Sequence, residues 1–136
     1  MGYLKQYLLH GETVKFDKFK NNIYPKIVDF MFEQAPEEYS EDLVKADLKV
    51  FDYTVLTEFL EDYLGIKCNC GYYDEWKIGN IIDKEDEIKT VDNWNFDFEI
   101  PTKSSLNKKV KENEEFFKAI GVNTDNFCLS VSTESY

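Results

Sequence analysis

Titratable side chains that could do chemistry are few in type, although acidic ones are abundant. The 136-residue chain holds 27 Asp and Glu, one histidine, His10, and 16 basic residues, all of them lysine. Because the chain has no arginine, it has no guanidinium group to form bidentate hydrogen bonds with a carboxylate or a phosphate. His10 is the one side chain whose unperturbed pKa lies near neutrality. The composition therefore favours a binding protein over an enzyme.

The spacing of the residues that carry chemistry matches no catalytic or metal-binding motif. The six glycines fit neither G-x-G-x-x-G nor G-x-x-x-x-G-K-[ST], the two phosphate-binding patterns. The triplet [DE]-x-K of magnesium-dependent nucleases occurs three times, about as often as 27 acids and 16 lysines produce by chance. Cys68, Cys70 and Cys128 lack the spacing of zinc ligands and fit free thiols in a reducing compartment. We predict no catalytic residue, no metal and no cofactor.

Carboxylates and large aromatic side chains are concentrated together between residues 58 and 87. Residues 33–99 hold 19 acids and 6 lysines, net −13, whereas the remainder holds 8 acids and 10 lysines, net +2. Aromatic anchors bury a large area at low entropic cost, and surrounding carboxylates steer a cationic partner. The predicted partner-binding residues are Glu58, Glu61, Asp62, Tyr72, Tyr73, Asp74, Glu75, Trp76, Asp83, Glu85, Asp86 and Glu87, and Tyr63 is a further aromatic residue of this segment. The alternative is that the acids are ordinary solvated surface and the aromatic rings are core.

The sign of the charge indicates the kind of partner. Affinity for phosphates depends on cationic groups, so this chain is not expected to bind nucleic acid directly, and its natural partner is a basic protein. In size and composition, but in no motif, the chain resembles small acidic immunity proteins that neutralise toxin domains. That resemblance implies a toxin or nuclease domain as the partner. Phage or mobile-element inhibitors of restriction or CRISPR nucleases, which mimic nucleic acid, are similar in the same way.

Two other classes of function stay open. Two carboxylates brought together by the fold could serve as the acid and base of a small hydrolase, or the acidity could serve only the solubility of an adaptor subunit. No apolar run approaches the roughly 18 residues of a membrane span, and the N-terminus lacks a signal peptide pattern. We expect a cytoplasmic protein that does not bind a membrane.

Hydrophobic periodicity predicts the elements that must position these residues. Helical spacing indicates helices at residues 3–8, 22–36, 40–65 and 104–121, the last two ended by Gly65 and Gly121. Alternation indicates strands at 94–100 and 127–132, and a hairpin over 72–82 with a turn at Gly79 and Asn80. Helices grouped first and strands later predict one α+β domain over residues 1–136. In it, N-terminal helices pack with a small, mostly antiparallel sheet, and one further helix precedes a C-terminal strand.

Overall fold

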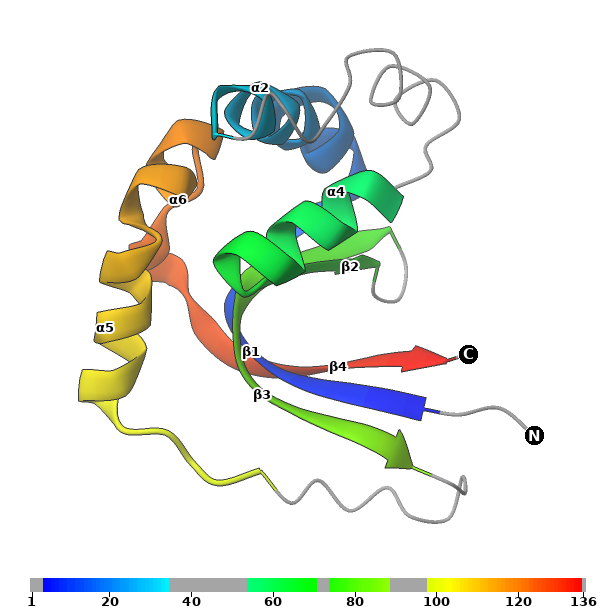
Figure 1. The fold of residues 1–136 in the computed structure, drawn as a ribbon, viewed down its shortest axis with the longest axis vertical. Helices are drawn as coiled ribbons and strands as arrows, with labels where there is room; N and C mark the ends of the chain where they lie inside the picture. The colour runs from blue at the N-terminus through cyan, green and yellow to red at the C-terminus, as the bar shows by residue number, and fades with distance from the viewer. Residues whose placement is uncertain (1–3, 35–53, 71–73, 89–97, 136) are drawn as a thin grey trace.

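A four-stranded antiparallel sheet with helices around it forms the fold (Figure 1). The computed structural model describes residues 4–34, 54–70, 74–88 and 98–135. The strand order is β2-β3-β1-β4. The strands are β1 (Leu4–Lys15), β2 (Ile66–Cys70), β3 (Glu75–Ile88) and β4 (Cys128–Ser135). The predicted α+β class, the antiparallel sheet and the C-terminal strand are confirmed.

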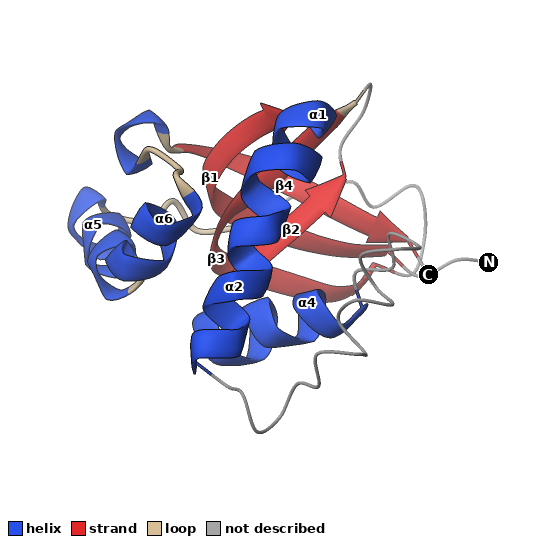
Figure 2. Ribbon diagram, turned by 90° about the horizontal axis from the view of Figure 1, so that it is seen from above, coloured by secondary structure: helices blue, strands red, loops and turns tan. Residues whose placement is uncertain are grey.

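The helices fall into three groups along the chain. After β1 come α1 (Phe16–Lys18), the π-helical turn η1 (Phe19–Ile23) and α2 (Tyr24–Gln34). Before β2 come α4 (Thr54–Phe59) and the π-helical turn η2 (Leu60–Leu64). Before β4 come α5 (Lys103–Glu112), α6 (Glu114–Ile120) and the 3-10 turn η3 (Thr124–Asn126). Figure 2 shows α2 lying over the strands, with α4 at one end of the sheet and α5 and α6 at its side. None of the helices in the described ranges is long and apolar enough to cross a membrane.

The N-terminal segment is a strand, and the prediction of a helix over residues 3–8 is wrong. β1 lies inside the sheet and pairs with both β3 and β4. Four consecutive side chains, at positions 6 to 9, are buried, so both faces of this part of the strand are covered. In a strand covered on both faces the apolar residues do not alternate, and here Leu4, Tyr7 and Leu8 fall at spacings that periodicity cannot distinguish from those of a helix. The predicted order of helices before strands fails for the same reason.

The predicted turn at Gly79 and Asn80 is also wrong, because β3 runs straight through it. Gly79 lies opposite Gly11 in the ladder between β1 and β3. A Cβ atom on either glycine would come within 3 Å of backbone atoms of the opposite strand, so only glycine permits this crossing. Figure 1 shows β1 and β3 curving from the level of β2 towards the level of β4. The two glycines therefore mark a bend in the sheet and not the end of a strand.

The other predicted elements are partly confirmed. The second helix begins earlier than predicted, at Phe16, but its predicted apolar face is buried at Ile23, Ile27 and Met31. Of the strand predicted at 94–100, residues 98–100 have no regular structure and the rest lies outside the described residues. Residues 40–53 of the third helix and residues 72–73 of the hairpin also lie outside them.

Two predicted helix ends are confirmed by backbone conformation. Gly65 follows η2 with φ +65° and Gly121 follows α6 with φ +76°, the left-handed region that glycine adopts without strain. The start of the last helix differs slightly, because its cap is Thr102 and not Ser104 or Ser105. The Thr102 hydroxyl accepts a hydrogen bond from the Ser105 amide at 3.1 Å.

The glycine crossing gives a prediction about stability. Replacing Gly79 by alanine forces two backbones apart, so we expect the free energy of unfolding to fall by about 2–4 kcal/mol, the range for severe overpacking. Gly65→Ala is the matched control, because its Cβ meets no atom within 4 Å and only the left-handed conformation costs energy, about 1 kcal/mol. Urea unfolding of both variants measures the difference. Equal losses would show that the crossing is not tight.

The environment of His10 gives a prediction about pH. Its ring stands edge-on to Phe127, with centroids 5.4 Å apart, and burial lowers the pKa of the imidazole below its usual 6.5. As the pH falls below about 6.5, His10 of the unfolded chain binds a proton that His10 of the folded chain binds only at a lower pH. The free energy of unfolding therefore decreases over this pH range. We expect His10→Gln to remove this part of the pH dependence. Urea midpoints at several pH values test it, and an unchanged slope would contradict it.

Candidate functional site

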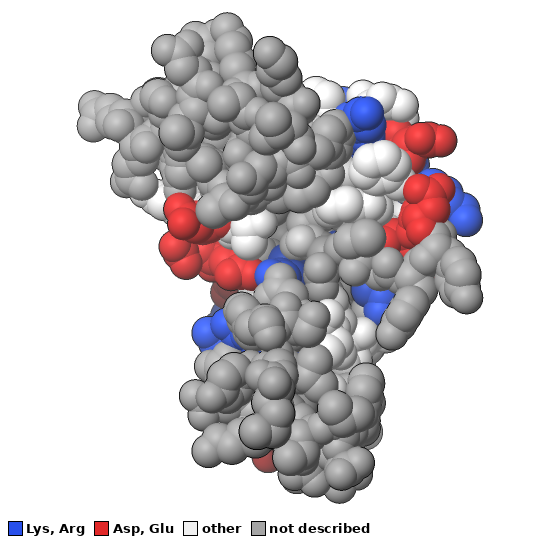
Figure 3. Space-filling view, turned by 90° about the vertical axis from the view of Figure 1, so that its right-hand side faces the viewer, with Lys and Arg blue, Asp and Glu red and all other residues white. Residues whose placement is uncertain are grey.

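The predicted partner-binding residues do not form one continuous surface in the described part of the chain. They fall on the helix before β2, at the start of β3 and further along β3. Glu75 and Asp83 are eight residues apart on that strand, about 26 Å if it were straight. Figure 3 shows acidic atoms on both sides of one face, with lysine atoms beside them. The acidic segment therefore divides into separate groups.

Several predicted residues cannot be placed. Tyr72 and Tyr73 lie outside the described residues, and so do the side chains of Glu85, Asp86 and Glu87, whose backbone belongs to β3. Their role stays a prediction.

Trp76 belongs to the core, and the prediction that it is an exposed anchor is wrong. Its side chain is 8% exposed, and its ring stacks on Phe19 with centroids 4.5 Å apart and ring planes 6° apart. It shares its face of β3 with buried Ile78, because side chains two residues apart point the same way. The tryptophan therefore joins the helices to the sheet.

The acidic group at the start of β3 is mixed with lysine. Asp74 and Glu75 are exposed, but Glu75 lies opposite Lys15 in the ladder with β1. The Asp74 carbonyl accepts a hydrogen bond from the Phe16 amide, which places this group beside Lys15 and the start of α1. Directly opposed charges of opposite sign reduce the local field. This group is a weak candidate for an acidic docking surface.

The helix before β2 carries a purely acidic surface. Leu56, Phe59 and Leu60 are buried, so the spacing of α4 and η2 turns the positions between them outwards. Glu58 and Asp62 are exposed, Glu61 is partly exposed, and residues 54–64 include no lysine. We call Glu58, Glu61, Asp62 and Tyr63 the acidic helix face.

Tyr63 is the aromatic residue of this face. It is 49% exposed, one of the few large apolar side chains on the surface of the described part of the chain. Its ring lies 5.4 Å from that of buried Phe59, measured between centroids. The ring is therefore braced against the core and still offers about half of its area to a partner.

The acidic helix face is fixed to the sheet by a buried lysine. The Lys67 ammonium group donates a hydrogen bond to Glu61 Oε1 at 2.6 Å, and the Lys67 side chain is only 2% exposed. The same nitrogen lies 4.8 Å from the centroid of the Tyr7 ring on β1, a cation–π contact. This pair could not be predicted from the sequence, because a lysine in a strand normally points to solvent.

Other lysines also place their charge on internal acceptors. Lys77 Nζ donates to the Val131 carbonyl at 3.0 Å, and Lys109 Nζ donates to the Ile81 carbonyl at 2.8 Å. Within the described part of the chain, the Glu58 and Asp62 carboxylates, by contrast, make no hydrogen bond or ion pair. Because Lys67 pairs with Glu61, the exposed negative charge of the acidic helix face comes mainly from Glu58 and Asp62.

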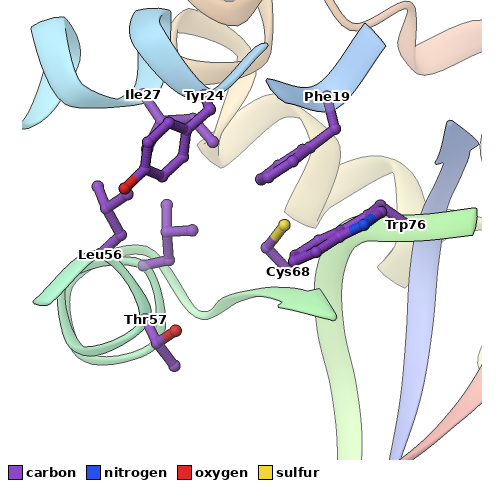
Figure 4. A pocket seen from close by; sticks show the side chains of 8 residues that line it. Phe19, Tyr24, Ile27, Leu56, Thr57, Cys68 and Trp76 are labelled. Atoms are coloured by element: carbon purple, nitrogen blue, oxygen red, sulfur yellow. The ribbon is translucent and has the colours of Figure 1, made fainter. Parts of the chain in front are cut away.

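A small apolar pocket lies between α2, α4 and the sheet (Figure 4). Its empty volume is about 240 Å³ including space open to solvent, and the enclosed part holds little more than one water molecule, which is too small for a ligand site. Figure 4 shows the Cys68 sulfur beside the Trp76 ring. The lining residues are Phe19, Tyr24, Ile27, Leu56, Thr57, Leu60, Cys68 and Trp76. None of them is a carboxylate or an imidazole, so this pocket offers no acid–base pair for hydrolysis.

Comparisons with other proteins add no assignment. Family models, curated proteins and solved structures give no significant match to this chain. In the described part of the chain, no group of three or more His, Cys, Asp or Glu side chains could hold a metal ion. A function therefore has to be argued from the geometry and the charge of the acidic helix face.

The buried lysine gives a prediction about this site. Glu61→Gln leaves the Lys67 ammonium group without its countercharge, so we expect the free energy of unfolding to fall by about 1–3 kcal/mol. The loss is below that of a fully buried pair because Glu61 is 28% exposed. Changing both residues, as Glu61→Gln with Lys67→Met, should restore at least half of it. Chemical unfolding of the single and double variants measures the coupling.

Glu58→Gln is the matched control, because the Glu58 carboxylate is exposed and has no partner in the ranges that the structure describes. We expect it to change stability by less than about 0.5 kcal/mol. A double variant less stable than Glu61→Gln alone would show that Lys67 is held by something other than Glu61.

Proposed function

We propose that this chain is a small acidic cytoplasmic protein that neutralises a basic protein partner. The partner class we favour is a toxin domain, most simply a nuclease, which makes the chain an immunity protein. One observation carries the proposal: half-exposed Tyr63 lies on a helical segment that also exposes Glu58 and Asp62 and holds no lysine. An exposed aromatic side chain is the kind of anchor that dominates protein interfaces, and carboxylates on the same segment steer a basic partner towards it.

The proposed mechanism needs no catalytic residue. A nuclease binds phosphates with lysine and arginine side chains around its active site. Glu58 and Asp62 would take the positions of those phosphates, and Tyr63 would bury its ring at the centre of the contact. Because the two carboxylates have no partner among the described residues, binding breaks no ion pair in that part of the chain. A total buried area of about 1,600 Å² would suffice for tight binding.

Charge also determines how fast such a complex forms. A net charge of −11 attracts a basic protein from beyond contact distance, and salt screens this attraction over about 10 Å at 0.1 M. Association should therefore be fast at low salt and slow at high salt, whereas dissociation should depend on Tyr63. The two parts of the acidic helix face are thus separable by kinetics.

The test uses capture followed by kinetics. The immobilised chain captures proteins from a lysate of cells that carry its gene, and mass spectrometry identifies what binds. We expect a basic protein whose association rate falls at least tenfold between about 0.05 and 0.5 M salt. Glu58→Lys with Asp62→Lys should lower the rate at low salt by about tenfold or more and flatten its salt dependence. Tyr63→Ala should raise the dissociation rate by at least tenfold.

The control variant keeps the same spacing and the same change of net charge. Asp29 and Glu33 are exposed, lie four residues apart on α2 and have no described partner, so Asp29→Lys with Glu33→Lys alters the total charge equally. If both double variants slow association to the same extent, the association rate depends on the total charge of the chain and not on the acidic helix face. Capture of an acidic partner, or of no partner, would contradict the proposal. Capture of a host defence nuclease would instead assign the chain to the anti-defence inhibitors.

A further inference from the structure

A polar cluster lies between the sheet and the joint of α5 and α6. Asn80 of β3 lies opposite His10 of β1 in the antiparallel ladder. Directly opposed residues point to the same face of a sheet, with their Cβ atoms about 4.5–5.5 Å apart. Asn113, which joins α5 to α6, reaches this face, because its side chain forms a hydrogen bond with that of Asn80. Three polar side chains from three separate elements are therefore close together.

The hydrogen bonds of Asn113 fix the orientation of the Asn80 amide. Asn113 Nδ2 donates to Asn80 Oδ1 at 2.7 Å and to the Leu64 carbonyl at 3.0 Å. A carbonyl can only accept, so the Asn113 atom that faces Leu64 is the nitrogen. The Asn80 atom that faces this nitrogen must then be the oxygen. The Asn80 nitrogen, with its two N–H donors, is therefore turned away from Asn113.

The Asn80 nitrogen is buried and unpaired. Asn80 is 1% exposed, and its Nδ2 makes no hydrogen bond to any residue that the structure describes. On the β2 side, Asn80 lies opposite Ile66, and Ile78 precedes it on the same face of β3. Both isoleucine side chains are buried and offer no acceptor. His10, on the β1 side, is the polar neighbour that the register gives to this donor.

His10 carries a matching unpaired atom. Its ring is partly exposed, but Nδ1 is buried and forms no hydrogen bond within the described ranges. The ring contacts Phe127 edge-on, and Leu129 lies opposite His10 on β4, so these side chains offer no donor. Burial lowers the pKa of the imidazole, which keeps it neutral at pH values near 7, and one nitrogen of a neutral imidazole is an acceptor. A donor on β3 and an acceptor on β1 thus occupy adjoining positions on one face.

The spacing of these two atoms suits one water molecule. No direct hydrogen bond joins Asn80 Nδ2 to His10 Nδ1. A water that accepts from one atom and donates to the other can join atoms up to roughly 5.6 Å apart, twice a hydrogen-bond length of about 2.8 Å. Opposed side chains in a ladder are separated by a similar distance. Buried waters in proteins typically pair polar groups of this kind, whereas apolar cavities stay dry.

We infer that Asn80 and His10 hold one internal water molecule, which accepts a hydrogen bond from Asn80 Nδ2 and donates one to His10 Nδ1. The water completes a polar chain that runs from His10 through Asn80 to Asn113. Asn113 extends this chain to the Leu64 carbonyl at the end of η2. The chain connects β1 and β3 with helices that are distant in the sequence. The inference concerns the interior and not a partner, so it and the proposed function can fail separately.

Magnetic relaxation dispersion of the water oxygen tests the inference on the full chain, because it counts waters that stay bound longer than the protein takes to rotate. We expect His10→Phe, which keeps a ring against Phe127 and removes both nitrogens, to lower this count by one. His10→Asn is the matched control, because its side-chain amide places a polar atom where Nδ1 was. The count for His10→Asn should equal that of the wild type.

A second measurement uses the wild type alone, so it does not depend on how the variants fold. NMR spectra should show cross-peaks between a long-lived water and the Asn80 side-chain amide protons, and His10 Nδ1 should have the nitrogen shift of a hydrogen-bonded acceptor. A scalar coupling between Asn80 Nδ2 and His10 Nδ1 would reveal a direct hydrogen bond and overturn the inference. Missing water cross-peaks at Asn80, an unchanged count in His10→Phe, or an equal loss in His10→Asn would also overturn it.

Discussion

The close crossing of β1 and β3 at Gly11 and Gly79 is the constraint on which the rest of the structure depends. Lys67 lies opposite Gly79, and Gly79 lies opposite Gly11, so Lys67 sits in register with the crossing itself. The Lys67 nitrogen lies 4.8 Å from the Tyr7 ring of β1. That nitrogen in turn holds Glu61. The orientation of the acidic helix face thus follows from two residues that have no side chain.

The same arrangement separates the charges of the molecule. A lysine removed from water is costly unless an anion and further acceptors replace its hydration, and here Glu61 and the Tyr7 ring do so. Lys67 pairs with Glu61 and not with Glu58 or Asp62, so these two exposed carboxylates carry the negative charge of the acidic helix face. Stability and recognition are therefore linked, because the ion pair that holds the helix to the sheet also fixes the position of the exposed carboxylates.

The sequence predicted the features that local chemistry determines. Gly65 and Gly121 end helices because only glycine adopts the left-handed conformation there without strain, and β4 alternates as a half-buried strand should. The errors arose where tertiary structure decides. The pattern of β1 predicts a helix because both faces of this strand are buried. Gly79 predicts a turn, although in the structure it allows two strands to cross closely.

The candidate site was predictable to the same degree. The carboxylates and Tyr63 are evident from composition, but the partner of Glu61 is not, because Lys67 reaches it only after the sheet has bent. Trp76 shares the aromatic, acidic sequence context of Tyr63, yet one ring is core and the other surface. Which of the two is exposed depends on the face of the element, and that face is known only once the register is known.

The central claim is that negative potential is concentrated on the acidic helix face and is not spread over the molecule. Paramagnetic cosolutes that differ only in charge measure this directly, because the ratio of the NMR relaxation they cause at each proton reports the potential near that proton. Among the described residues, we predict the most negative values at 58–63 and values closer to zero at 128–132. A uniform potential, or a stronger minimum on another element such as α2, would contradict the account.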